Sequence, residues 1–328
     1  MLEKSYRWGI IAPGRIAHKF AQALDAVPDG HLHAVLSRDA DRAKGFAVQY
    51  GASASTDSLD RFLNELKPDA AYIASPHTFH YDQALACLEA GIPVLCEKPL
   101  TVNARQAQQL IDASRNNGVF LMEAVWTRFL PIYTDIRKWL VEGRIGPVSL
   151  ITSTFGFKAP RNLKDRVFNP DLAGGALLDI GIYNLTVSQW IMGREPSSFS
   201  ADGVLGETGV DELLSVNLRY GAEQISQFSC SVRTDLANEC VISGDQGRIT
   251  IHPRFWNGAT ATLLVGDHTE TVTRPFLRNG FEYQIEEVQR CLSSGVLESP
   301  AIPHSDTLNT MKLMDAIRAD IGVVYPFE

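Results

Sequence analysis

Short apolar runs alternate with amphipathic stretches along the first 124 residues, and this alternation leaves few possible folds. Between the runs, apolar side chains recur at helical spacing. Gly51, Gly91 and Gly118 follow the amphipathic stretches, where glycine suits the left-handed C-cap of a helix. This order predicts an α/β domain with a doubly wound parallel sheet. The predicted strands are 7–11, 32–37, 70–74, 94–97 and 119–122.

From Val125 onward the pattern changes. A predicted helix at 129–143 is followed by apolar runs that have turn residues, and not helices, between them. Such strands predict an α+β domain on a large, mainly antiparallel open sheet. We therefore expect two domains, 1–124 and 125–328. The strands expected in the second are 148–157, 213–220, 224–232, 239–251 and 259–266, and the further helices are 174–193, 281–295 and 305–322.

The segment WGIIAPGRIA, residues 8–17, is close to G-x-G-x-x-G/A, the phosphate-binding fingerprint of Rossmann domains. Gly14 keeps the position at which a side chain would hold the backbone away from a pyrophosphate. Ala12 replaces the first glycine, and it fits a tight turn if its φ stays negative. A helix starting there would offer N–H groups to phosphate. The predicted cofactor-binding residues of this loop are Ala12, Pro13, Gly14, Arg15 and Ile16.

The end of the second strand favours NADP over NAD as the cofactor. NAD-binding domains usually place an acidic residue there for the ribose 2′-hydroxyl, whereas this strand ends in Ser37 and Arg38. A guanidinium group pairs well with a 2′-phosphate, and Arg42, one helical turn later, offers a second contact. Asp39 has two interpretations: a ribose ligand placed one residue late, or the N-cap of the next helix.

Polar residues follow two further strands. Ligands of an open α/β sheet bind outside the carboxyl ends of its strands, so both groups should face the same crevice as the loop. Each histidine is either a cofactor contact or an ordinary residue at a helix start. The cofactor-binding residues predicted here are Ser75, Pro76, His77 and His80 after the first of these strands, and Glu97 and Lys98 after the second.

Asp179 and Tyr183 lie four residues apart in a predicted helix, which places both on one face. Alcohol oxidation needs a base for the hydroxyl proton, and a phenol with a pKa near 10 serves only if a cation stabilises its ionised form. Lys98 is a candidate for that cation, and Asp179 for an orienting group. The alternative is structural, with the ring of Tyr183 buried and Asp179 paired locally.

Five motifs together carry a resemblance to the Gfo/Idh/MocA family of oxidoreductases, over essentially the whole chain. EKP followed by GG-x-x-x-D-x-G-x-Y is specific in combination. The branch that the chain is most similar to contains dimeric dihydrodiol dehydrogenase and NADP-dependent pyranose (xylose or glucose) dehydrogenases. The motifs are WGIIAPGRIA, SPHTFH, CEKPL, MEAVWTRF and GGALLDIGIYNL.

This resemblance implies roles for several residues. Lys98 would touch the nicotinamide ribose and the substrate, and Tyr183 would occupy the place of the catalytic histidine of inositol dehydrogenases. Asp179 matches an aspartate on the same helix. Trp126 and Arg128 would line the nicotinamide end of the crevice, and the C-terminal sheet would form a homodimer. The sequence departs from the family pattern at Ala12 and at His77, where asparagine is frequent.

Aromatic and basic residues of the second half are candidates for a substrate pocket. An aromatic wall with few charges suits a neutral cyclic polyol, either a pyranose or a trans-dihydrodiol. Core packing is the alternative for each aromatic residue, and Arg161 or Arg128 offers a site for a carboxylated substrate. The predicted substrate-binding residues are Phe157, Arg161, Phe168 and Trp256, with Phe155 and Phe281 as further candidates.

The composition excludes several classes of partner. A net charge of −8 without a basic tract argues against nucleic acid and anionic membranes. Five cysteines without C-x-x-C spacing predict buried thiols and no metal site. No apolar run is long enough to span a membrane, and MLEKSYRWG does not resemble an export signal, so we expect a cytoplasmic protein.

Together these features predict an NADP-dependent dehydrogenase of a cyclic alcohol, in which Lys98, Asp179 and Tyr183 are catalytic. One alternative is a sensor that binds NADP(H) without chemistry, although a sensor has no need of all three residues. A transferase of similar architecture would leave these residues unexplained.

Overall fold

The structure is a computed structural model that describes residues 5–328. Residues 1–4, part of the N-terminal stretch used above to judge location, lie outside the described residues. Contacts divide the chain into two compact units. The first unit comprises Met1–Phe129 and Leu277–Leu308, and the second comprises Leu130–Phe276 and Asn309–Glu328.

The first unit contains a six-stranded parallel sheet of order β3-β2-β1-β4-β5-β6. Its central strands are buried on both faces, as expected for a sheet covered by helices. The doubly wound fold is therefore confirmed. The three-residue strand β3 was not predicted, because it is too short to show a pattern. The strands are β1 (Tyr6–Ile11), β2 (Gly30–Leu36), β3 (Ala54–Thr56), β4 (Ala70–Ile73), β5 (Val94–Glu97) and β6 (Leu121–Ala124).

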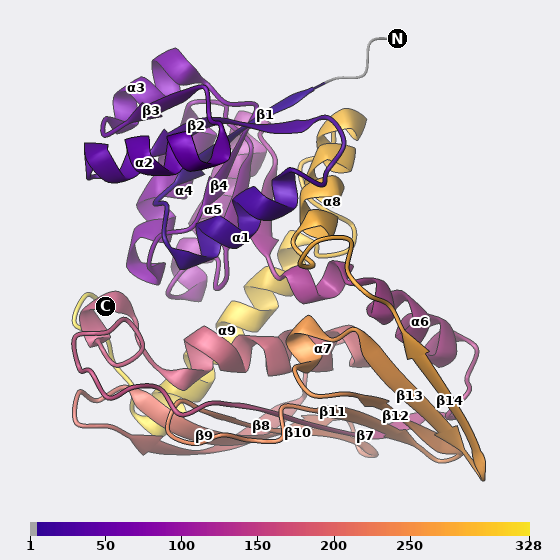
Figure 1. Ribbon diagram of the computed structural model, residues 1–328. Helices are drawn as coiled ribbons and strands as arrows, with labels where there is room; N and C mark the ends of the chain where they lie inside the picture. The colour runs from indigo at the N-terminus through magenta and orange to yellow at the C-terminus, as the bar shows by residue number, and fades with distance from the viewer. Residues whose placement is uncertain (1–4) are drawn as a thin grey trace. The chain divides into compact units, whose positions relative to one another are not determined.

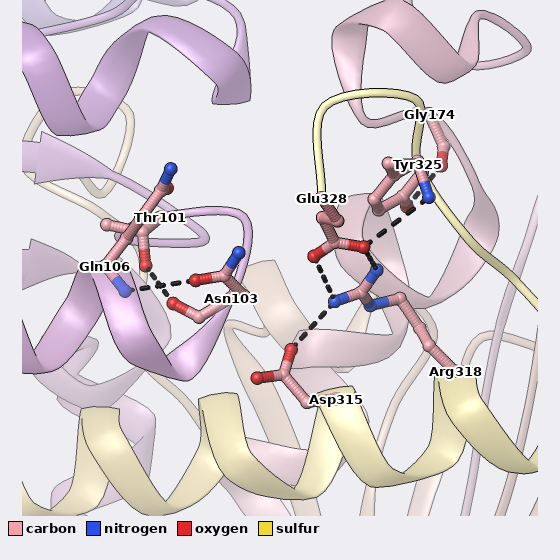
Figure 2. A network of polar contacts seen from close by, with 8 residues as sticks. All are labelled: Thr101, Asn103, Gln106, Gly174, Asp315, Arg318, Tyr325 and Glu328. Carbon is pink, nitrogen blue, oxygen red and sulfur yellow. Dashed lines mark hydrogen bonds and ion pairs between the residues drawn. The ribbon is translucent and has the colours of Figure 1, made fainter.

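Helices flank this sheet (Figure 1). Gly51 and Gly118 end α2 and α5 with φ of 68° and 65°, which confirms their prediction as C-caps. Asn103 begins α5, where its side chain accepts a hydrogen bond from the backbone N–H of Gln106 at 3.0 Å (Figure 2). The elements are α1 (Arg15–Leu24), α2 (Ala40–Tyr50), α3 (Leu59–Arg61), η1 (Phe62–Leu66), η2 (His77–Phe79), α4 (His80–Glu89), α5 (Ala104–Asn117), η3 (Trp126–Phe129) and α8 (Glu282–Ser294).

Helix α1, which follows the fingerprint loop, is fixed to the sheet by aromatic packing. Phe20 stacks on Tyr72 of β4 with ring centroids 3.9 Å apart, and it meets Trp8 of β1 edge to face at 5.2 Å. All three side chains are buried. Burial of each ring contributes about 2 kcal/mol to the stability of the folded unit. The loop between β1 and α1 is therefore held at both ends.

Within this loop the expected backbone conformation of Ala12 is wrong. Its φ is 65°, in the left-handed region, and not negative. Two hydrogen bonds fix the turn: the N–H of Ala12 donates to the carbonyl of Leu36 at 2.9 Å, and its own carbonyl accepts from Gly14 N–H at 2.8 Å. A methyl group in this region costs about 1 kcal/mol, so the chain keeps the turn that glycine would favour at some local strain.

The second unit contains an eight-stranded sheet of order β14-β13-β12-β11-β7-β10-β9-β8. All neighbours are antiparallel except β7 and β10, so the prediction of a mainly antiparallel sheet is confirmed. The edge strands β8 and β14 were not predicted, because they are rich in polar residues. The strands are β7 (Val148–Gly156), β8 (Ser198–Leu205), β9 (Asp211–Tyr220), β10 (Gln224–Ser231), β11 (Cys240–Gly244), β12 (Gly247–Ile251), β13 (Thr260–Val265) and β14 (His268–Thr273).

Helices cover one face of this sheet, among them α7 (Ile182–Met192) and the part of α9 (His304–Ile321) that belongs to this unit (Figure 1). Helix α6 (Pro131–Val141) contacts β13 and β14. In β9 the side chains of Leu214, Val216 and Leu218 are buried, whereas the alternate residues are exposed or partly exposed. Among the described residues, no helix covers the opposite face (Figure 1).

Two further features bear on the expected partners. None of the helices in residues 5–328 combines the length and apolarity needed to cross a bilayer. The same residues contain no group of three His, Cys, Asp or Glu side chains arranged to bind a metal ion, and the five cysteines are buried free thiols.

Candidate active site

The carboxyl ends of five parallel strands bring most of the predicted cofactor residues to one edge of the first unit. The fingerprint loop follows β1, Arg38 follows β2, Ser75 follows β4, Lys98 follows β5 and Trp126 follows β6. The order of connection reverses between β1 and β4, which are neighbours in the sheet. Such a switch point is where open α/β sheets bind nucleotides.

The start of α1 fits a phosphate group. A Cβ built on Gly14 would meet only the carbonyl oxygen of Ala12, at 4.0 Å, so the backbone there is open to a ligand. No side chain caps this helix, and its first turn contains no acidic residue. The first N–H groups and the positive end of the helix dipole can therefore serve a pyrophosphate.

The segment after β2 presents two exposed guanidinium groups. The Arg38 guanidinium lies 5.2 Å from the centroid of the Phe79 ring, and Arg42 is exposed on α2. Asp39 accepts a hydrogen bond from the backbone N–H of Arg42 at 3.0 Å, so its interpretation as an N-cap is confirmed. Ser37 accepts from Asp39 N–H at 3.2 Å.

His80 connects the two polar segments of this edge. Its Nε2 lies 2.9 Å from the carbonyl oxygen of Ser75, and its Nδ1 lies 2.8 Å from that of Pro99. Burial lowers the pKa of His80, while the two carbonyl groups favour the protonated ring. Both nitrogens thus face protein atoms, which supports the structural interpretation of this histidine. His77 is buried nearby, with its ring 5.8 Å from that of His80.

Lys98 lies directly after β5, and the residues around it are anchored. Tyr72 donates a hydrogen bond to Glu97 Oε1 at 2.5 Å, and the backbone N–H of Lys98 donates to Glu97 Oε2 at 3.3 Å. The Lys98–Pro99 peptide bond is cis. Leu100 N–H donates to Glu123 Oε1 at 2.9 Å. The backbone on both sides of the lysine is therefore tied to buried acceptors.

Trp126 and Arg128 follow β6 and are both largely buried. The ring of Trp126 packs at 4.7 Å from that of Phe281. Arg128 forms an ion pair with Asp306 at 3.0 Å, and its side chain is only 5% exposed. Because Asp306 compensates its charge, Arg128 is a poor choice for binding a carboxylated substrate.

In the second unit, Asp179 lies in the π-helical turn η5 (Leu177–Gly181) and Tyr183 lies in the first turn of α7. Both side chains are buried. Arg166 donates two hydrogen bonds to Asp179, from Nη1 to Oδ1 at 2.9 Å and from Nη2 to Oδ2 at 3.2 Å. This pairing was missed from the sequence, because Arg166 lies in an irregular segment without periodicity. The pairing agrees with the structural alternative for Asp179, in which its carboxylate is paired locally.

Aromatic side chains line the surroundings of Tyr183. The ring of Phe155 lies 5.8 Å from that of Tyr183, and it stacks on Trp256 with a centroid distance of 3.3 Å and an interplanar angle of 7°. Two predicted candidates thus form a wall beside the phenol. Phe157 is partly buried, and its N–H donates to the carbonyl of Ser231 at 3.0 Å.

The other two substrate candidates line a cavity of about 640 Å³ in the same unit. Arg161 forms an ion pair with buried Glu212 at 2.5 Å, and its guanidinium lies 5.1 Å from the centroid of the Phe168 ring. Arg233 approaches the other oxygen of Glu212 at 3.6 Å. The structure thus groups Arg161 and Phe168 around Glu212, and Trp256 around Phe155 and Tyr183.

The first unit, a parallel sheet with an uncapped helix at its switch point, has the architecture of a nucleotide-binding domain. Residues 6–125 match the model of an oxidoreductase family with an NAD-binding Rossmann fold, and residues 133–250 match the GFO/IDH/MocA C-terminal domain. The chain belongs to the Gfo/Idh/MocA family, as its sequence motifs predicted. It is an NAD(P)-binding dehydrogenase that acts on CH–OH groups.

Relatives of similar length support this assignment. Trans-1,2-dihydrobenzene-1,2-diol dehydrogenase of Xenopus tropicalis is 36% identical over 98% of this chain and 99% of its own. The human enzyme of the same name is 34% identical over 98% of each chain. A 3-ketoreductase of Actinomadura kijaniata, solved with NADP and TDP-benzene, has a TM-score of 0.85 and 27% identity over 97% of this chain and 98% of its own.

The pH dependence of stability should report on Glu123, the buried carboxylate that holds the backbone after Lys98. Burial raises the pKa of Glu123 to about 7 from 4.5, although hydrogen bonds from Thr307 and Leu100 and the charges of Lys98 and Arg128 act in the opposite direction. Between these two values the folded chain binds more protons than the unfolded chain, so stability falls as the pH rises from 4.5 to 7. This difference between the pKa values of Glu123 in the folded and unfolded chain lowers the free energy of unfolding by roughly 3 kcal/mol at high pH.

We therefore expect Glu123→Gln to raise the melting temperature more at pH 8 than at pH 5. Glutamine can still accept from Leu100 and donate to the Thr307 hydroxyl, and it carries no charge at either pH. The measurement is thermal unfolding of both proteins across this range. Glu65→Gln removes an exposed carboxylate of the same unit and serves as the control. A stabilisation by Glu123→Gln that is the same at pH 5 and pH 8 would contradict the raised pKa of Glu123.

Proposed function

We propose that this protein is an NADP-dependent dehydrogenase that transfers a hydride between nicotinamide and a secondary or anomeric alcohol of a cyclic polyol. A pyranose sugar and a trans-dihydrodiol are the candidate substrates. The dihydrodiol dehydrogenases, at 34–37% identity over nearly the whole chain, support the diol. The aromatic wall of Phe155 and Trp256 beside Tyr183 supports a substrate that offers C–H faces.

In the proposed mechanism, Tyr183 takes the hydroxyl proton of the alcohol during oxidation and returns it during reduction. The bound cofactor supplies the hydride acceptor or donor. The Lys98 ammonium stabilises the ionised phenol and hydrogen-bonds the substrate oxygen, because an adjacent positive charge favours a phenolate. Asp179, held by Arg166, orients these groups. The fingerprint loop binds the pyrophosphate of the cofactor.

The observation that carries this proposal is the pairing of Arg166 with Asp179 next to Tyr183. Two hydrogen bonds fix the carboxylate in a buried turn directly before the helix that holds the phenol. A buried carboxylate is costly unless it is paired, and this one is paired in a defined orientation. Such a preorganised group suits the orientation of a proton-transfer partner.

Tyr183→Phe should retain cofactor binding and lose turnover. Removal of a general acid–base group lowers kcat by roughly 100- to 10,000-fold. The measurement is reduced-nicotinamide absorbance with a panel of pyranoses and trans-diols, together with cofactor titration by fluorescence. Tyr220→Phe is the control, because Tyr220 is buried in the same unit and its hydroxyl has no hydrogen-bond partner among the described residues. Full activity of Tyr183→Phe would remove the proposed role, and an inactive wild type would favour the sensor.

Arg38 should determine the preference for NADP. Charge-assisted hydrogen bonds contribute about 1.5–3 kcal/mol, so Arg38→Ala should weaken NADP binding by roughly tenfold or more and leave NAD binding nearly unchanged. Arg42→Ala should act in the same direction with a smaller effect. The measurement is the Kd of each cofactor by titration. Arg115→Ala, an exposed change in the last turn of α5, provides the control. Equal losses for both cofactors would argue against a 2′-phosphate contact.

We also propose a homodimer formed through the face of the eight-stranded sheet that no described helix covers. Leu150 of β7 is 37% exposed on this face. Along β7 and the neighbouring strand β11, partly exposed side chains alternate with buried ones. The wild type should then sediment at twice the 36.1 kDa of one chain. Leu150→Arg should shift it to the monomer, whereas Val141→Arg, at an 80% exposed position of α6, should not. Monomeric wild type would contradict the proposal.

A further inference from the structure

Gly174 and Gly175 precede η5, which holds Asp179, and α7, which holds Tyr183. Hydrogen bonds fix the backbone of both glycines. Gly174 N–H donates to the carbonyl of Asn169 at 3.0 Å, and Gly175 N–H donates to that of Val167 at 2.9 Å. A Cβ on Gly174 would lie 2.7 Å from the carbonyl oxygen of Arg166 and 2.9 Å from that of Asn169. The turn therefore packs directly against the segment from which Arg166 reaches Asp179.

Asp211, the first residue of β9, fixes the other side of the same turn. Its Oδ2 accepts a hydrogen bond from Leu177 N–H at 2.7 Å, at the start of η5. Gly175 has a φ of 126°, and a Cβ there would lie 2.2 Å from Asp211 Oδ1. Neither glycine can accept a side chain without a shift of its neighbours. The position of η5 thus follows from the position of the glycine turn.

The segment 323–328 reaches the glycine turn through Tyr325. The Tyr325 hydroxyl donates to the carbonyl oxygen of Gly174 at 2.7 Å (Figure 2), and the side chain is fully buried. This hydrogen bond lies away from solvent, where a lone carbonyl oxygen without a partner is costly. Tyr325 therefore restrains the glycine turn in addition to the bonds within it.

Tyr325 is itself held by Arg318 of α9. The Arg318 guanidinium lies 4.8 Å from the centroid of the Tyr325 ring. Its Nη1 donates to Glu328 Oε2 at 2.8 Å, and its Nη2 donates to Glu328 Oε1 at 3.0 Å and to Asp315 at 2.8 Å (Figure 2). The side chain of Arg318 is only 5% exposed, so these ion pairs are little screened. The ion pair of Arg318 with Glu328 holds the segment 323–328 next to the last turn of α9.

We propose that Tyr325 is a positioning residue for catalysis, because its hydroxyl holds the glycine turn that places Arg166 and Asp179. The Arg318–Glu328 pair sets the position of the Tyr325 ring. This inference rests on the proposed role of Asp179. It assigns no contact with substrate or cofactor to Tyr325.

Tyr325→Phe removes only the hydroxyl and keeps the ring against Arg318. We expect kcat to fall about tenfold, because small misplacement of a catalytic group costs rate, while the Kd for NADP stays within about twofold. Amide hydrogen exchange at 174–179 should accelerate. Tyr220→Phe removes the hydroxyl of another buried tyrosine of the same unit, and it should change neither kcat nor the exchange rate at 174–179. Glu328→Gln weakens the ion pair with Arg318 and should produce the same changes at smaller size.

A double-mutant cycle separates this role from a general loss of stability. If Tyr325 acts through Asp179, Tyr325→Phe should lower kcat in the wild type and have no further effect in an Asp179→Asn background. Equal losses in both backgrounds, or an unchanged kcat and exchange rate in Tyr325→Phe, would overturn the inference. If the wild type shows no turnover, the proposed function fails, and hydrogen exchange at 174–179 alone then decides the inference.

Discussion

The geometry before helix α7 depends on the neutralisation of the buried Asp179 carboxylate by Arg166. Asp179 lies inside a π-helical turn, where a buried carboxylate without an ion-pair partner would cost about 3–5 kcal/mol. Arg166 removes this cost, but only because the irregular segment before the helix folds back over it. That fold-back requires two positions without a side chain, Gly174 and Gly175, and Gly175 has a φ of 126°, which favours glycine. Asp211 and Tyr325, from distant parts of the sequence, then stabilise the turn by hydrogen bonds.

The first unit follows a similar principle around Lys98. The lysine directly follows the buried strand β5, and the neighbouring backbone is fixed by Glu97, His80 and Glu123, all of them buried. Polar groups of this kind are tolerated in a dry interior when every one has a partner, and they then define a single geometry. Thus several hydrogen bonds to buried groups fix the backbone beside Lys98 in the first unit, and several fix the turn before Asp179 in the second.

The sequence predicted the features that depend on periodicity and failed on those that depend on single contacts. The continuous apolar runs of β4 and β5 and the glycines after α2 and α5 gave the doubly wound sheet, and the family motifs gave the dehydrogenase class. Polar edge strands such as β8 leave no alternating pattern to detect. Arg166 could not be found, because its partner is defined by the fold of an irregular loop. The positive φ of Ala12 accompanies one hydrogen bond to Leu36 of the neighbouring strand and one to Gly14 within the loop, and the contact with the strand is not local in sequence.

The division of the chain between the units has a consequence for its synthesis. The hydroxyl of Tyr6 on β1 contacts the Gln289 carbonyl and Ser293 of α8, and Glu123 on β6 accepts from Thr307. The nucleotide-binding sheet is therefore covered by residues that are synthesised only after all strands of the eight-stranded sheet. A fragment ending near residue 129 would expose the surface that α8 covers, so exchange of this module between relatives must include both of its separate pieces.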